Sequence, residues 1–231
     1  IGALRKLGGA VPGAWLVEGL HRVLGRLGED ALWRIFPESW HDDDIVVYQF
    51  PRVYGITPLT QAIAREAVKY VAEGIRFLEF GAGTGVQSAL LAQAAEKQGV
   101  IIHITAVEKD MVAALNAEFN SRKQGRNRKV ELIHGDGIEL LRNRTFDVII
   151  LKLAYWELGP ILEAAKGLLG PDTVILYTGA DFKTDEARTM AETSGYTFSP
   201  LSEEGVFEIR YAGTSGFRGR SEKATSSPID R

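Results

Sequence analysis

Apolar and polar residues follow two different rhythms on either side of three glycines, Gly81, Gly83 and Gly85. Before the glycines, residues 75–80 form a short apolar run of the kind found in a buried strand. After them, residues 86–92 place apolar side chains at the spacing of a helix. A strand, a glycine turn and a helix in this order open a βαβ nucleotide-binding unit, and glycine lets a ligand approach the backbone closely.

The same periodicity predicts an α/β protein with a mostly parallel, Rossmann-like sheet and an antiparallel hairpin at its C-terminal end. An N-terminal helical cap is expected over 1–54, the sheet domain over 55–212, and a disordered tail rich in Gly, Ser and Thr over 213–231. Further strands are expected at 45–50, 100–107, 130–133, 146–151, 173–177, 196–200 and 206–211, and helices at 11–28, 30–36, 61–72, 111–119, 163–169 and 183–194.

Composition narrows the function less than the pattern does. Among 231 residues, 25% are charged and the net charge is −3, so there is no basic field of the kind that holds nucleic acid. Cysteine is absent, which excludes disulfides, thiolate metal sites and a cysteine nucleophile. No apolar run approaches the roughly 20 residues of a membrane-spanning helix, and we expect a cytoplasmic protein of undetermined oligomeric state.

The spacing of the glycines favours one cofactor. Dinucleotide sites use G-x-G-x-x-G, whereas this chain has G-x-G-x-G followed by Val86, with Glu79 two residues before Gly81. A carboxylate at Glu79 would repel a pyrophosphate but suits a ligand with an ammonium and a sulfonium group. The segment resembles motif I of the class I methyltransferases, which implies S-adenosylmethionine (SAM) as cofactor and a seven-stranded sheet. An NAD-dependent dehydrogenase is disfavoured.

The resemblance extends to two further strand ends. Glu108 ends the second strand, where an acidic side chain accepts hydrogen bonds from ribose hydroxyls. In this class an acidic residue at the position of Asp136 accepts a hydrogen bond from the adenine amino group. The cofactor-binding residues implied are Glu79, Gly81, Ala82, Gly83, Gly85, Glu108, Lys109, Gly135, Asp136 and Gly137.

Shorter segments resemble the protein-L-isoaspartate O-methyltransferase family. They are residues 34–38, the pair Ile56-Thr57 ahead of the helix before motif I, the Gly-Asp-Gly turn at 135–137, and Trp156-Glu157-Leu158. In that family a hydroxyl at the position of Thr57 lies beside the methyl-transfer site, which makes Thr57 a candidate catalytic residue. The chain departs from the family at Pro58, which follows the hydroxyl residue directly instead of a Gln-Pro pair.

The end of the fourth strand should face the transferred methyl group, so its chemistry distinguishes acceptors. The sequence there, residues 152–157, has neither the Asp that holds Mg²⁺ in catechol-type enzymes nor an Asn/Asp-Pro-Pro-Tyr turn, and we expect no metal. Tyr155 and Trp156 are expected to wall the substrate pocket. Lys152 is a second candidate catalytic residue that either attracts a substrate carboxylate or extends to solvent.

Methyl transfer from a sulfonium depends mainly on positioning and electrostatics, and a carboxylate acceptor needs no general base because it is ionised at neutral pH. The leading hypothesis is therefore a SAM-dependent methyltransferase acting on a protein or peptide carboxylate. Two alternatives stay open. One is a methyltransferase for a small molecule, such as a corrin ring, since those enzymes also have an Ile-Thr segment ahead of a Gly-x-Gly-x-Gly turn. The other is a SAM-binding regulatory protein without activity.

Overall fold

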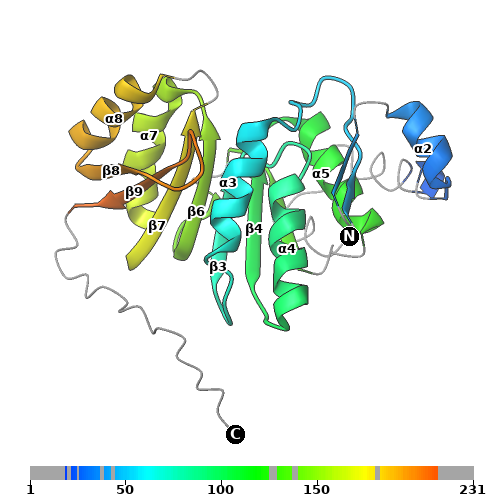
Figure 1. The fold of residues 1–231 in the computed structure, drawn as a ribbon, viewed down its shortest axis with the longest axis horizontal. Coiled ribbons are helices and arrows are strands. Elements are labelled where there is room, and N and C mark those ends of the chain that lie inside the picture. Colours follow the sequence, from blue (N-terminus) through cyan, green and yellow to red (C-terminus); the bar gives the residue numbers. More distant parts are fainter. Residues whose placement is uncertain are drawn as a thin grey trace, which may run out of the picture.

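A seven-stranded sheet forms the centre of the molecule (Figure 1). The computed structural model describes residues 19, 22–24, 26–36, 39–42, 45–124, 129–136, 140–179 and 183–212. The strand order is β5-β4-β3-β6-β7-β9-β8, with parallel pairing from β5 to β7 and antiparallel pairing of β9 with both β7 and β8. The strands are β3 (Arg76–Phe80), β4 (His103–Glu108), β5 (Val130–His134), β6 (Phe146–Leu153), β7 (Leu169–Gly179), β8 (Tyr196–Pro200) and β9 (Phe207–Tyr211). The predicted Rossmann-like sheet with an antiparallel end is confirmed.

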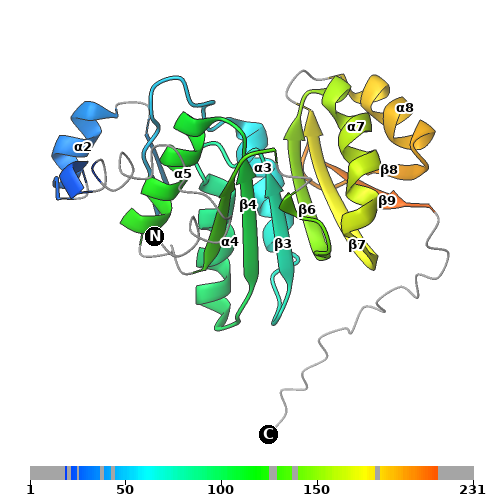
Figure 2. The ribbon, with the colours of Figure 1, turned by 180° about the vertical axis from the view of Figure 1, so that it is seen from behind.

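Helices cover both faces of this sheet, as views from opposite sides show (Figures 1 and 2). One apolar cluster joins α3 (Pro58–Val68) and α4 (Val86–Gln98) to the sheet, with Ala117 of α5 (Met111–Lys123) at its edge. On the other face, α7 (Tyr155–Ala165) and α8 (Thr184–Thr193) pack on β6 and β7. The central strands β3 and β6 are therefore buried on both sides, which explains their nearly continuous apolar sequences.

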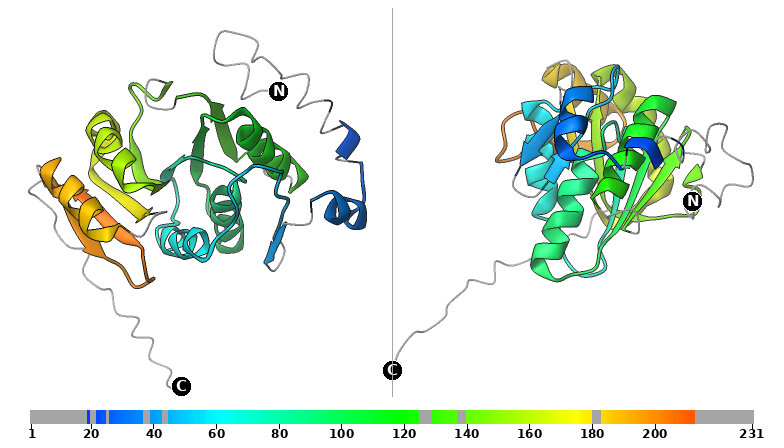
Figure 3. Two further views of the ribbon diagram at one scale, coloured as in Figure 1. Left: turned by 90° about the horizontal axis from the view of Figure 1, so that it is seen from above. Right: turned by 90° about the vertical axis from the view of Figure 1, so that its right-hand side faces the viewer.

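The N-terminal segment differs from the predicted helical cap. A helix, α2 (Glu29–Ile35), is present, but a small antiparallel hairpin of β1 (Trp40–Asp42) and β2 (Ile45–Val47) follows it. Figure 1 and the view from above in Figure 3 place α2 at the opposite end of the molecule from β8 and β9. Most of the helix predicted over 11–28 lies outside the described residues, as do Gly137 and the predicted tail over 213–231.

The strand predicted over 45–50 is correct only as far as Val47, because the backbone beyond it bonds to side chains of α5. The N–H groups of Tyr48 and Phe50 donate to the side-chain oxygens of Asn120 and Asn116, at 2.9 and 2.8 Å. Both asparagines also donate to the carbonyl of Tyr48. This backbone therefore docks on a helix instead of pairing with another strand.

The bounds of α5 and α7 also differ from the sequence prediction. Helix α5 continues to Lys123, past the predicted end at residue 119, and Asn120 in the added turn is buried. The helix expected to end at Leu169 ends at Ala165, a 3₁₀ turn, η2 (Lys166–Leu168), follows, and β7 starts at Leu169. The N–H of Gly170 donates to the hydroxyl of Thr173, at 2.7 Å, in the part of β7 where the pairing with β6 is irregular.

Candidate functional site

A cavity of about 470 Å³ opens at the carboxyl ends of β3, β4 and β6. The chain runs outward from β3 to β5 on one side and from β6 to β7 on the other, so the cavity lies where the strand order reverses, the usual ligand site of such sheets. Its lining comprises Arg52, Val53, Tyr54, Gly55, Thr60, Gly81, Ala82, Gly83, Thr84, Val86, Gln87, Glu108, Asp110, Ala113, Lys152, Leu153, Ala154 and Glu157.

The glycine turn after β3 forms one wall. Gly81 and Gly83 both have left-handed backbones, with φ of +72° and +54°, a region that glycine enters without steric cost. A Cβ on Gly81 would meet no protein atom within 4 Å. The turn therefore leaves space beside its backbone for a ligand.

Glu108 links this turn to the end of β4. Its side chain is 8% exposed; one carboxylate oxygen accepts from the N–H of Gly83 and the other from the N–H of Asp110, each at 2.9 Å. A carboxylate oxygen can accept two hydrogen bonds, so each keeps a free position. The carboxylate is held rigidly and can still receive two hydroxyl donors, as a ribose diol requires.

The start of α4 adds an unused donor. Gln87 is 3% exposed and lines the cavity, and its side-chain Nε2 has no hydrogen-bond partner among the described residues. Burying such a group without a partner costs on the order of 1–3 kcal/mol. Helix α4 also begins at Gly85 without a side-chain cap. A ligand with a hydrogen-bond acceptor at this point would satisfy these groups, so the residues present fit a cofactor of the predicted kind.

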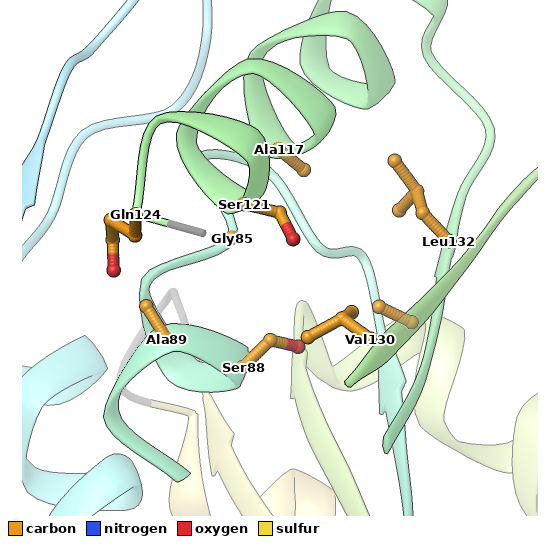
Figure 4. Close-up of a pocket in the computed structure, with 9 residues that line it drawn as sticks. Gly85, Ser88, Ala89, Ala117, Ser121, Gln124, Val130 and Leu132 are labelled. Carbon is orange, nitrogen blue, oxygen red and sulfur yellow. The ribbon is translucent and has the colours of Figure 1, made fainter. Parts of the chain in front are cut away.

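Gly85 has a different role from the two glycines before it. It is absent from the cavity lining and packs against α5, where a Cβ would lie 3.2 Å from Ala117. Figure 4 shows Gly85 between α4 and α5, beside a small apolar void of about 10 Å³ that is too small for a ligand. Gly85 therefore sets the spacing of the helices around the site.

Glu79 also lies behind the cavity, and we correct the expectation that it faces a ligand. Its side chain is 0% exposed and accepts a hydrogen bond from the hydroxyl of Ser88 in α4. Burial raises its pKa to about 8, against the opposing effect of the Ser88 hydrogen bonds. Glu79 therefore fastens β3 to α4 from within the core.

Lys152, at the end of β6, lies on the same side of the sheet as Glu79, but its side chain lines the cavity. Burial lowers its pKa to about 8, while the nearby Glu79 acts in the opposite direction. Its Nζ donates to the hydroxyl of Thr60 and lies 4.3 Å from the centre of the Tyr54 ring. Of the two alternatives for Lys152, extension to solvent does not fit this geometry, because the ammonium group is held inside the site.

The structure brings Thr60 to the cavity in place of Thr57. Thr57 caps α3 by accepting from the N–H of Thr60 at 3.2 Å, and the Thr60 hydroxyl accepts in return from the N–H of Thr57. The two hydroxyl oxygens are 3.0 Å apart. Thr57 therefore contacts Lys152 only through Thr60, and Pro58 at the first helical position fits this capping role.

The aromatic pair expected in the pocket lies at its edge. Tyr155 and Trp156 form the first turn of α7 with their rings 5.4 Å apart, Trp156 is 60% exposed, and neither lines the cavity. Leu153, Ala154 and Glu157 do.

Three other residues of the predicted cofactor set that the structure describes, Lys109, Gly135 and Asp136, do not line the cavity. Lys109 is exposed, and its Nζ is 3.6 Å from a carboxylate oxygen of Glu157. Asp136 is exposed at the end of β5, and the N–H of Gly135 bonds to the carbonyl of Glu108 at 2.9 Å. Ala82, in contrast, is part of the lining.

Residues 52–55 form a wall that the sequence analysis did not anticipate. Arg52 and Tyr54 reach the cavity from the loop between β2 and α3, and Arg52 has a left-handed backbone with φ of +69°. The one available signal was the Pro51-Arg52 pair, which is typical of a turn. Among the described residues, no group of three or more His, Cys, Asp or Glu side chains could hold a metal ion.

No helix in the described part of the chain is long and apolar enough to cross a membrane.

The strand order and the glycine turn anchored to an acidic strand end define the class I methyltransferase fold. A solved structure titled precorrin 8w decarboxylase, from Methanobacterium thermoautotrophicum, shares this fold, with a TM-score of 0.55 and 20% identity, covering 71% of this chain and 94% of that one. The family model for protein-L-isoaspartate(D-aspartate) O-methyltransferase matches residues 36–158, more than half of the chain. The chain belongs to this family.

Curated relatives carry two kinds of name. A protein-L-isoaspartate O-methyltransferase of Pyrobaculum neutrophilum is 37% identical over 90 residues, 38% of this chain and 42% of that protein. A tRNA1(Val) (adenine(37)-N6)-methyltransferase of Pasteurella multocida is 32% identical over 102 residues, 43% of this chain and 42% of that protein. The chain thus matches less than half the length of either relative.

Proposed function

We propose that this protein is a SAM-dependent methyltransferase that methylates a carboxylate of a protein or peptide, of the isoaspartyl type. The observation that carries this proposal is the distribution of charge in one cavity. Glu108 and Asp110 lie at the β4 end, where a ribose would be bound. Arg52 in the loop before α3 and Lys152 at the end of β6 supply positive charge for an acceptor, with the Glu157 carboxylate at the start of α7 also in the lining.

Each wall has a distinct task in this reaction. The bound cofactor would supply a methyl group on a positively charged sulfur. Glu108 would orient the ribose, the glycine turn would admit the cofactor beside its backbone, and Gln87 would donate to a carboxylate or carbonyl oxygen at the start of α4. These contacts act by positioning, which can account for several kcal/mol of a methyl-transfer barrier.

Lys152 would orient the acceptor carboxylate. A carboxylate is ionised at neutral pH, and a neighbouring ammonium group draws it into the site without removing a proton. Thr60 holds the Lys152 Nζ, and Thr57 holds Thr60, so the hydroxyl of Thr57 would act through this chain and not by direct contact. An amine acceptor is disfavoured, because the N–H groups of the amine need a hydrogen-bond acceptor and the ammonium group of Lys152 has no lone pair.

The proposal is tested by methyl transfer to a matched pair of peptides. One peptide contains isoaspartate and the other contains ordinary aspartate at the same position, with SAM labelled in its methyl group. We expect incorporation into the isoaspartyl peptide that mild base releases as methanol, since methyl esters are base-labile. Label that resists base would show transfer to nitrogen or carbon, and no transfer to either peptide despite cofactor binding would favour a regulatory role.

A further inference from the structure

Arg52 stands out in the acceptor wall because its backbone adopts a conformation that its side chain disfavours. It follows Pro51 in a turn closed by the N–H of Val53 and the carbonyl of Phe50, at 3.1 Å. Its φ of +69° belongs to the left-handed region, which turns of this kind usually fill with Gly or Asn. An arginine there costs on the order of 1 kcal/mol relative to glycine.

This turn is firmly held. Phe50 and Val53 are buried, and the Phe50 N–H donates to Asn116 at 2.8 Å. The side-chain amide of Gln49 donates to the carbonyl of Val53 at 3.2 Å, which ties the two ends of the turn together. The left-handed conformation is thus imposed by packing on α5, and it aims an exposed arginine at the cavity.

The guanidinium group also has no partner among the described residues. In the part of the chain that the structure describes, Arg52 forms no ion pair or hydrogen bond. Lys152, which also lines the cavity, is already held by Thr60 and by the ring of Tyr54, two residues after Arg52. An arginine with a strained backbone and no partner among the described residues lines the same cavity as a fixed lysine. Together they make a site for an anion, and the planar fork of arginine suits a carboxylate bound by two hydrogen bonds.

We infer that Arg52 is an acceptor-binding residue that grips the carboxylate of the peptide to be methylated. This inference rests on the proposed function, because it takes the acceptor to be a carboxylate. Arg52 would then determine specificity for the acceptor. Removing its charge should weaken acceptor binding and leave cofactor binding and the reaction rate of the bound complex nearly unchanged.

Four variants test the assignment. Arg52→Gln removes the charge, Arg52→Lys keeps it without the fork, and Arg52→Gly removes the charge and the backbone strain together. Arg34→Gln, at an exposed position of α2, is the matched control. For Arg52→Gln and Arg52→Gly we expect the KM for an isoaspartyl peptide to rise by about tenfold or more, with kcat within about threefold and S-adenosylhomocysteine binding unchanged.

Arg52→Lys should restore part of the loss, and Arg34→Gln should behave like wild type. Arg52→Gly should in addition raise Tm by about 2–4 °C, because it releases the left-handed strain. A residue kept only for structure would not give a more stable protein that binds its acceptor less well. An unchanged KM in both Arg52→Gln and Arg52→Gly would overturn the inference.

A binding experiment separates this inference from the proposed activity. The isoaspartyl peptide, and the same peptide with its carboxylate converted to an amide, are titrated into the complex with S-adenosylhomocysteine. Preference for the carboxylate that is lost in Arg52→Gln supports the inference even if no methyl transfer occurs, in which case the proposed activity alone fails. Methyl transfer with equal binding in wild type and Arg52→Gln overturns the inference alone, and absence of both binding and transfer overturns both.

Discussion

The two walls of the cavity are built in different ways. The cofactor wall comes from contiguous sequence at the ends of β3 and β4, and its key bond joins Glu108 to the backbone of Gly83. The acceptor wall is assembled from a loop ahead of α3, the first turn of α3 and the end of β6, and it is held by side-chain contacts such as Lys152 with Thr60. The sequence of the cofactor wall is constrained because its ligand is always the same. Single residues of the acceptor wall can change to suit a different acceptor.

The sharpest test of this division removes the carboxylate that anchors the cofactor wall. Glu108→Ala should weaken binding of S-adenosylhomocysteine by about 100-fold or more, because the ligand loses two hydrogen bonds and the Gly83 N–H loses its partner. Calorimetric titration with S-adenosylhomocysteine and with NAD⁺ measures this. Glu96→Ala, a surface carboxylate paired with Lys129, is the control. Equal affinity in Glu108→Ala would remove Glu108 from the site, and tight NAD⁺ binding would contradict the cofactor class.

Changing the acceptor wall should leave the cofactor wall intact. Lys152→Met keeps much of the side-chain volume but removes the charge and the bond to Thr60, and we expect kcat/KM for the isoaspartyl peptide to fall by roughly 30-fold. Affinity for S-adenosylhomocysteine should change by less than about threefold, on the reading that the walls act separately. A large loss of cofactor affinity in this variant would show that the two walls are not independent.

Gly85 packs α4 against α5 behind the cavity, so changing it tests packing and not ligand binding. Gly85→Ala must accommodate both φ of +78° and a Cβ 3.2 Å from Ala117, so we expect a loss of about 2–3 kcal/mol in unfolding free energy. Gly99→Ala is the matched control, since Gly99 has φ of +68° and nothing within 4 Å of an added Cβ. It should lose only about 1 kcal/mol by urea unfolding. Equal losses in the two variants would show that the contact with Ala117 costs nothing.

The pH dependence of acceptor binding gives the smallest expected effect. The pKa of Lys152 is lowered to about 8, so its charge is present below this pH and lost above it, while a peptide carboxylate stays ionised throughout. The KM for the isoaspartyl peptide should therefore rise by about tenfold or less between pH 7 and pH 9. Lys152→Arg keeps its charge over this range and should show a flat profile. A KM that falls with rising pH in wild type would contradict the sign.

The sequence predicts the cofactor wall well because its information is local. A strand, a glycine turn and an acidic residue at the next strand end follow from patterns a few residues long, and Gly81, Gly83 and Glu108 all line the cavity. Glu79 shows the limit of such patterns. Its position in the motif is visible in the sequence, but its complete burial depends on how α4 covers β3.

The acceptor wall was less predictable because it depends on contacts between distant segments. The sequence pointed to the hydroxyl of Thr57, but the start and helical phase of α3 bring Thr60 to Lys152 instead. Arg52 reaches the cavity only because Asn116, 64 positions later in the chain, holds the preceding backbone on α5. No local pattern reports such a contact.

The amide of Asn120 has a consequence for how the protein can be divided. Its Nδ2 donates both to the carbonyl of Thr84 in the glycine turn, at 2.9 Å, and to the carbonyl of Tyr48, at 2.8 Å. A fragment that starts at residue 55, where the patterns place the domain boundary, would remove the hydrogen bonds of two buried asparagines to Tyr48 and Phe50 and uncover the apolar surface of α5. The smallest unit that could be moved, recombined or fused to another protein therefore begins before β2, because the side chain of Asn120 holds both the glycine turn and the upstream segment.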